Sequence, residues 1–169
     1  MGGRGWDPGR NVERRYPGPV AVIAVGEAAP LVPGVTFEEG PVALVFYKVT
    51  CPVCQMAAPK VDVMGQAYPR RVVGLGQDPP GELERFGRDF GMGVRAIPDL
   101  PPYDVSTAYG IESVPTLFVI DAAGTVADVV VSWDRAGYNR ASARLAELLG
   151  VEPVTVSESS DGLPPFRPG

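Results

Sequence analysis

The sequence predicts a mixed α/β domain in which helices pack against a central β-sheet. Runs rich in β-branched and aromatic residues alternate with stretches of helical periodicity along the chain. A strand pair joined by a tight turn, followed by one more helix, completes the alternation. The chain has 169 residues, 45% of them hydrophobic and 21% charged, which suits one globular domain with a sizeable core.

Five short apolar runs bounded by turn residues are predicted strands. They span residues 20–25, 42–49, 71–76, 116–121 and 125–132. The last two runs are separated by Asp121-Ala122-Ala123-Gly124, which has the composition of a hairpin turn. We therefore expect these two strands to pair with each other.

Three helices and one helical turn are predicted between and after these strands, at residues 52–67, 80–90, 135–149 and 104–109. Asp78 is expected to cap the second helix, and Gly91 is expected to end it. Asp134 is expected to cap the last helix, which ends at Gly150. The apolar stripes of these helices are predicted to be core faces, and they consist of Leu83, Phe86 and Phe90 and of Tyr138, Ala141, Leu145, Leu148 and Leu149.

The two ends of the chain are expected to be flexible tails around a domain at residues 20–150. Residues 1–19 are rich in glycine, proline and arginine, and residues 151–169 combine a polar run with Pro164 and Pro165. The first tail lacks the apolar core of a secretory signal, so we expect a cytoplasmic protein, with an exported mature form as the alternative. The apolar run at 20–25 is too short to span a membrane.

Charge and composition exclude some partners. The formal net charge is −5, so an acidic surface gives no basis for nucleic-acid binding. We expect the partners to be disulfides or thiols of proteins or small molecules, for the reasons that follow, and we expect a monomer. The upstream reductant is left open.

The only two cysteines form the motif Cys51-Pro52-Val53-Cys54 at a predicted strand-to-helix junction. Cys51 then lies at the helix N-terminus, where unpaired backbone N–H groups and the helix dipole stabilise a thiolate. Cys54 follows one turn later, close enough to form a disulfide with Cys51. The motif therefore predicts a reversible dithiol/disulfide centre.

Three other uses of the cysteines fit the sequence less well. A structural zinc site or an iron–sulfur cluster usually needs about four ligands, and the chain has two cysteines and no histidine. A purely structural disulfide would close too short a loop to constrain the unfolded chain much. We therefore predict no metal and no cofactor other than the redox-active Cys51–Cys54 disulfide.

The motif and its surroundings resemble the thioredoxin-like superfamily over roughly residues 20–150. Pro59 follows the second cysteine at the place of a helix-kinking proline, and the segment from Tyr109 to Leu117 resembles the one that holds a cis-proline, here Pro115, beside the disulfide. The resemblance implies a three-layer sandwich with a central mixed β-sheet.

Two further features resemble TlpA/redoxin-type thiol–disulfide oxidoreductases. The segment from Gly26 to Pro30 has the G-x-x-A-P pattern of this branch. An extra helix–strand unit at about residues 77–98, preceded by a glycine-containing strand, is an insertion that plain thioredoxins lack. The resemblance thus implies a thioredoxin-like fold with this insertion.

The resemblance also implies roles for individual residues. Cys51 is the nucleophile and Cys54 resolves the mixed disulfide, with Val114, Pro115 and Thr50 contacting the substrate. Thr50 is expected either to offer its hydroxyl to the Cys51 sulfur or to cap the helix. The expected supporting residues are Pro52, Val53 and Pro59.

The chain departs from the family pattern at the proton-transfer group. The two places where relatives carry a buried carboxylate near the second cysteine hold Val45 and Ala57 here. Glu27, Asp78 or a water molecule are the alternatives. Lys60, one of only two lysines, is expected to be a solvated helix residue rather than a thiolate partner.

Two competing functions use the same cysteines. A peroxiredoxin reduces hydroperoxides at a cysteine three positions after a threonine, but three positions after Thr50 stands Val53. A non-enzymatic redox sensor or binding module would use the disulfide as a switch. The first would favour peroxide over protein disulfides, and the second would exchange thiols slowly with any partner.

Overall fold

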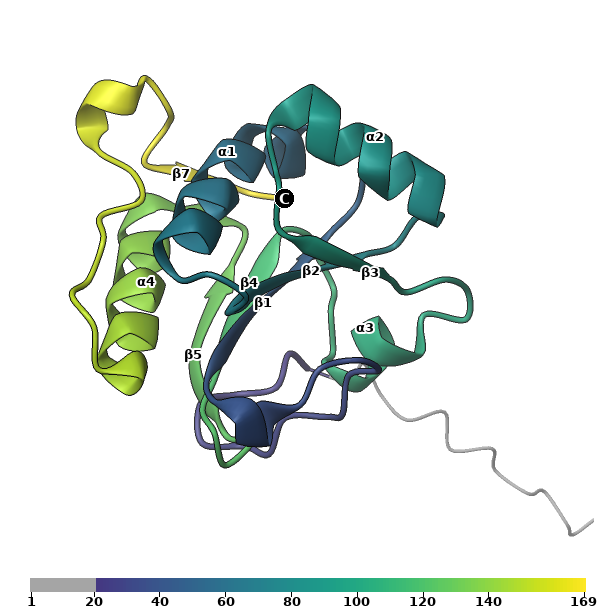
Figure 1. Cartoon of the computed structure of the whole chain (residues 1–169). Coiled ribbons are helices and arrows are strands. Elements are labelled where there is room, and N and C mark those ends of the chain that lie inside the picture. The colour runs from purple at the N-terminus through teal and green to yellow at the C-terminus, as the bar shows by residue number, and fades with distance from the viewer. Residues whose placement is uncertain (1–20) are drawn as a thin grey trace, which may run out of the picture.

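The computed structural model describes residues 21–169. The expected tail at 1–19, and Val20 of the first predicted strand, lie outside the described residues. A five-stranded sheet in the order β3-β2-β1-β4-β5 forms the centre of the molecule (Figure 1). Its strands are β1 (Val42–Tyr47), β2 (Val72–Gly76), β3 (Arg95–Pro98), β4 (Thr116–Ile120) and β5 (Val126–Val131).

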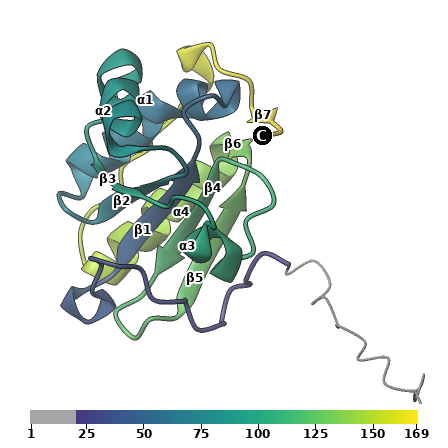
Figure 2. The ribbon, with the colours of Figure 1, turned by 90° about the vertical axis from the view of Figure 1, so that its right-hand side faces the viewer.

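Helices cover both faces of this sheet. The helices are α1 (Pro52–Ala67), α2 (Pro80–Phe90), α3 (Asp104–Ala108) and α4 (Arg135–Leu149), with short 3-10 turns at Phe37–Glu39 and Ser159–Asp161. Helices α1, α2 and α4 lie on one face, and α3 lies on the other with the segment that precedes β1 (Figure 2). The predicted three-layer arrangement is confirmed. None of the helices in the part of the chain described is long and apolar enough to cross a membrane.

Strand β1 is the centre of the mixed sheet. It runs parallel to β2 and antiparallel to β4, so that Val45 lies opposite Gly74 on one side and Leu117 on the other. All six residues of β1 are buried, because both faces of the strand are covered. Alternate side chains therefore enter two separate cores, with Val45 on the α1 side and Leu44 on the α3 side.

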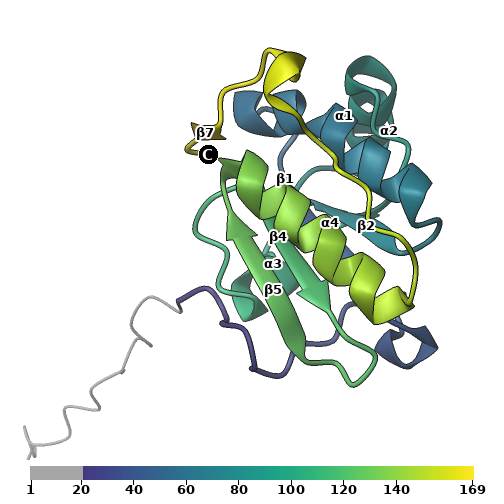
Figure 3. The same cartoon turned by 90° about the vertical axis from the view of Figure 1, so that its left-hand side faces the viewer.

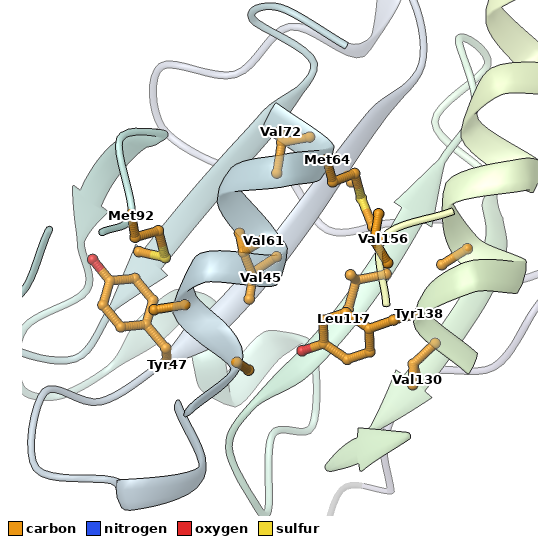
Figure 4. Packing of buried hydrophobic residues seen from close by; sticks show 14 of the residues in the cluster. Val45, Tyr47, Val61, Met64, Val72, Met92, Leu117, Val130, Tyr138 and Val156 are labelled. Atoms are coloured by element: carbon orange, nitrogen blue, oxygen red, sulfur yellow. The ribbon is translucent and has the colours of Figure 1, made fainter. Parts of the chain in front are cut away.

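The larger core lies between the sheet and helices α1, α2 and α4. Figure 4 shows part of it, with Val61 and Met64 of α1, Leu117 of β4 and Tyr138 of α4 in one cluster. Each of these four side chains is at most 1% exposed. Burial of this kind is the main favourable term that holds the helices on the sheet.

The helix predictions hold, but one capping prediction is wrong. Helices α1, α2 and α4 have the predicted bounds, and Gly91 and Gly150 adopt the left-handed conformation that ends α2 and α4. Pro79, not Asp78, is the N-cap of α2, because the Asp78 carboxylate accepts a hydrogen bond from Val49 N instead. Asp134 is the N-cap residue of α4, yet its side chain makes no capping hydrogen bond.

The first predicted strand is not formed. Within the described residues 21–25 there is no strand, and Val25 is 61% exposed. Ile23 N donates to Tyr109 O at 3.3 Å, whereas Gly26 N donates to Val126 O at 2.9 Å. Since these acceptors belong to different elements, no continuous ladder can form.

The segment from Val151 to Gly169 also differs from the expected flexible tail. It runs back along α4 and α1, with Val156 and Ser157 each 2% exposed (Figure 3). Near its end, β7 (Phe166–Arg167) pairs with β6 (Trp133–Asp134). The segment is held mainly by hydrogen bonds to side chains of the domain, which its polar composition does not reveal.

Lys60 contributes to this attachment and is not a freely solvated residue. Its Nζ lies 2.5 Å from Asp161 Oδ2, and the Lys60 side chain is only 19% exposed. The ion pair, together with the Glu158 N–H, lowers the pKa of the Asp161 carboxyl to about 2. The carboxylate thus stays charged across the neutral pH range.

Candidate active site

Cys51 and Cys54 lie at the junction between β1 and α1. Cys51 is the N-cap of α1, and Pro52 follows at the first helical position, where a missing N–H costs nothing. The Cys54 N–H donates to Cys51 Sγ at 3.2 Å. A negative charge on Cys51 Sγ would therefore be stabilised by the helix N-terminus, as the motif predicts.

The two thiols have different surroundings. Both are free in this structure, but Cys51 is half-buried whereas Cys54 is 3% exposed. Burial, and then the hydrogen bond with Cys51, raises the pKa of the Cys54 thiol far above its usual range. Cys51 is thus the accessible sulfur, and Cys54 keeps its proton.

The segment containing Pro115 lies against the accessible sulfur. The Cys51 thiol donates to the Val114 carbonyl oxygen, with the sulfur and oxygen 3.5 Å apart. The Val114–Pro115 peptide bond is cis, and Pro115 is buried while Val114 is half-buried. Three of the residues expected at the site, Cys51, Val114 and Pro115, are therefore brought together.

The remaining expected residues are divided between surface and core. Thr50 and Pro52 are exposed beside Cys51, whereas Val53 is 5% exposed and packs in the larger core. Thr50 is not the helix cap, since Cys51 occupies that position. Pro59 lies inside α1 with its ring exposed, about two turns of the helix beyond Cys51.

Of the two carboxylates expected as proton-transfer groups, only Asp78 lies at this end of the sheet. Its Oδ2 accepts a hydrogen bond from Val49 N at 2.8 Å, two residues before Cys51, and the residue is 8% exposed. The Glu27 carboxylate accepts a hydrogen bond from Ala24 N, and the Glu27 carbonyl accepts one from Val126 N. Val126 begins β5, beside the start of β1 and thus at the end of the sheet opposite to the cysteines. Asp78 thus anchors the loop that carries the reactive cysteine.

Two tyrosines near the sulfurs have no counterpart in the sequence-based prediction. The hydroxyl groups of Tyr47 and Tyr138 are buried and have no hydrogen-bond partner among residues 21–169. Burial is the main cause that raises the pKa of both hydroxyl groups, and the Asp78 carboxylate adds to the shift at Tyr47. Both tyrosines are therefore neutral, and both occupy core positions that give no sequence signal for a site.

The arrangement of the two sulfurs suits thiol–disulfide exchange. Among residues 21–169, no group of three or more His, Cys, Asp or Glu side chains could hold a metal ion. An accessible thiol at a helix N-terminus, with a second buried thiol one turn away, can form a mixed disulfide and then resolve it.

Solved structures with the same arrangement of elements share the fold. A protein provisionally described as the thiol:disulfide interchange protein DsbE from Chlorobium tepidum is 23% identical, with a TM-score of 0.65 over 76% of this chain and 99% of that chain. A secreted Mycobacterium tuberculosis disulfide oxidoreductase homologous to E. coli DsbE is 21% identical, with a TM-score of 0.55 over 74% and 96% of the two chains. MTB dsbF is 26% identical, with a TM-score of 0.54 over 64% and 80%.

The family follows from the sequence match that includes this site. No curated protein matches the chain. Residues 34–129, however, match the AhpC/TSA family, and this span contains both cysteines, Val114 and Pro115. The match covers more than half of the 169 residues. The chain therefore belongs to the AhpC/TSA family of redoxin-type proteins and has a thioredoxin-like fold.

Proposed function

We propose that this protein is a thiol–disulfide oxidoreductase that exchanges electrons with protein disulfides through Cys51 and Cys54. The observation that carries the proposal is the contrast between the two sulfurs. Cys51 is accessible and accepts the Cys54 N–H, whereas Cys54 is buried and protonated. An exposed nucleophile with a resolving thiol one turn away suits two-step exchange.

The exchange balances in two steps. The Cys51 thiolate attacks one sulfur of the partner disulfide, the partner S–S bond breaks, and the other partner sulfur leaves as a thiolate that takes up a proton. Cys54 then loses its proton and attacks Cys51 Sγ, which breaks the mixed disulfide and releases the second partner sulfur. The protein ends with a Cys51–Cys54 disulfide, and the partner gains two electrons and two protons.

The backbone around Pro115 supports an extended substrate segment beside the sulfurs. The Val114 carbonyl lies 3.5 Å from Cys51 Sγ, so a chain that pairs with Val114 would pass the nucleophile. Thr50 and Pro52, the chain neighbours of Cys51, are exposed and extend this contact surface. Pro115 has no N–H, so at this position it cannot compete for the thiolate.

A hydroperoxide reductase is the second candidate, because the family includes the peroxiredoxin branch that the sequence resembles. The matched span supports this candidate in general terms. The position three residues after Thr50 argues against it, since Val53 there is a buried apolar residue of α1. A redox-sensing module remains the non-enzymatic alternative.

One comparison separates these functions. The reduced protein is mixed with insulin or with hydrogen peroxide, and the oxidation of its thiols is followed in both reactions. We expect faster reaction with the insulin disulfide, no reaction for Cys51→Ser, and a trapped mixed disulfide for Cys54→Ser. Faster peroxide consumption would favour the peroxiredoxin, and slow reaction with both would favour the sensor.

A further inference from the structure

The last seven residues form a strap that reaches the candidate active site. We define the C-terminal strap as Leu163–Gly169, with residues 163–165 as its root and residues 166–169 as its tip. At its root, Trp133 Nε1 donates to Pro164 O at 2.7 Å, and Arg135 Nη2 donates to Leu163 O at 2.5 Å. Figure 2 places its strand β7 beside β6, at the end of the molecule where α1 begins.

The tip of the strap lies directly on the peptide that faces the nucleophile. A Cβ atom added to Gly169 would be 1.8 Å from Val114 O and 3.3 Å from Pro115 Cδ. Gly169 N donates to Ser132 Oγ at 3.1 Å, and Ser132 N donates to Pro115 O at 2.8 Å. The strap therefore packs on the same Val114 carbonyl that accepts the Cys51 thiol.

Root and tip are held to very different degrees. Leu163 packs against the larger core, and the backbone of Pro164 and Pro165 accepts hydrogen bonds from Trp133 and Arg135. Residues 166–169 are exposed and are held by the two-residue pairing with β6 and by the Ser132 contact. Exposed backbone hydrogen bonds with little apolar burial are typical of segments that open locally.

We propose that the C-terminal strap is a built-in competitor for the substrate edge at Val114, and that it gates the site by substrate size. The inference rests on the proposed thiol–disulfide exchange. A protein disulfide that pairs with Val114 has to lift the tip first, because the same backbone cannot accommodate both segments. A small disulfide needs only to reach Cys51 Sγ and can leave the tip in place.

The chain offers two ways to open the tip and a matched control. Gly169→Ala forces the tip away from Val114, because the added methyl group would meet a backbone oxygen. Deletion of residues 166–169 removes the tip and leaves the root contacts of Leu163, Pro164 and Pro165. Gly81→Ala makes the same chemical change in α2, where a Cβ meets nothing within 4 Å.

The experiment compares the rates at which insulin and bis(2-hydroxyethyl) disulfide are reduced by the wild type, Gly169→Ala, the deletion variant and Gly81→Ala. The apparent rate scales with the fraction of molecules whose tip is lifted, so opening should raise the insulin rate at least about fivefold. The small-disulfide rate should stay within about twofold, and Gly81→Ala should match the wild type in both. Thermal unfolding of each variant checks that the domain is intact.

Three results would overturn the inference in distinguishable ways. Unchanged rates in both opened variants would show that the tip does not compete with protein substrates. Equal gains for both disulfides would show that the tip does not select by substrate size. In either case the exchange reaction stands. Inactivity of every protein towards both disulfides would overturn the proposed function and the gating together.

Discussion

The hydroxyl oxygen of Tyr68 lies 2.9 Å from Ser142 Oγ, and the two residues close a ring of hydrogen bonds with the backbone of Val154. Ser142 Oγ donates to Val154 O at 2.6 Å, and Val154 N donates to the Tyr68 oxygen at 2.9 Å. Because the Ser142 proton is used on Val154, the Tyr68 hydroxyl donates to Ser142. The ring joins the C-terminal end of α1, the middle of α4 and the segment that follows α4.

This ring predicts that Tyr68→Phe destabilises the fold, whereas Tyr138→Phe does not. Tyr68→Phe removes the donor to Ser142 Oγ and the acceptor of Val154 N, and should lower the free energy of unfolding by about 1–3 kcal/mol. The Tyr138 hydroxyl has no partner within residues 21–169, so its removal should change stability by less than about 1 kcal/mol or raise it. Urea unfolding of both variants measures the difference. Equal losses would mean that Tyr138 has a polar role in the reduced protein.

Gly76 at the end of β2 is predicted to be essential for the packing of α2. A Cβ there would lie 2.2 Å from Leu83 Cδ2, and Leu83 is 3% exposed in the core. Gly76→Ala should therefore cost about 1–3 kcal/mol through overpacking.

A double-mutant cycle with Leu83→Ala tests this steric cause. The double variant should be more stable than the sum of the two single changes implies, because the shortened side chain makes room for the methyl group. Strict additivity would show that the loss has another origin, such as the conformational freedom of Gly76.

Asp78 is predicted to act on Cys51 by positioning its loop. Asp78→Ala removes the acceptor of Val49 N and should cost about 1–3 kcal/mol and slow the attack of Cys51 on disulfides. Asp78→Asn keeps an oxygen acceptor and should retain most of the stability and of the rate. If Asn fails in exchange as badly as Ala while the fold stays stable, Asp78 transfers a proton instead.

The raised pKa of the Cys54 thiol predicts that the reduced protein loses stability at alkaline pH. Its pKa in the folded state is raised, chiefly by burial, so the unfolded chain ionises first. The stabilisation is fully present below about pH 8.5, the ordinary thiol value, and falls by up to about 1.4 kcal/mol for each pH unit above it.

A pair of variants separates this effect from the buried tyrosines. Cys51→Ala keeps Cys54 and cannot form the internal disulfide, and Cys51→Ala/Cys54→Ala removes both thiols. Tyr47, Tyr109 and Tyr138 are common to the two proteins. Unfolding free energies measured from pH 7 to 10 should diverge above about pH 8.5, with the single variant losing more. Parallel curves would contradict the burial of a protonated thiol.

Local signals were sufficient to predict most of the fold. The bounds of α1, α2 and α4 follow from periodicity together with Pro52 at one start and Gly91 and Gly150 at two ends. Strand β3 has no such signal, because Arg95 and Ala96 are exposed at the sheet edge and Pro98 interrupts the pattern. It was expected only as part of the inserted unit.

The residues of the candidate site also differ in how far local sequence signals predict them. The position of Cys51 at the helix start follows from spacing within the motif, and its contact with Val114 came from a family resemblance, since the two residues are 63 positions apart. The C-terminal strap could not be predicted, because backbone carbonyls of Leu163 and Pro164 make its main contacts and any sequence supplies such groups.

The placement of β1 between β2 and β4 has a consequence for the chain during its synthesis. Cys51 leaves the ribosome 63 residues before Val114, which at about 5–20 residues per second corresponds to about 3–13 s. In the finished protein Cys54 is buried in the core that also contains Leu117, Trp133 and Tyr138, all of which are made later still. Until then the core around Cys54 is incomplete, so the difference in exposure between the two sulfurs depends on the arrival of β4 and α4.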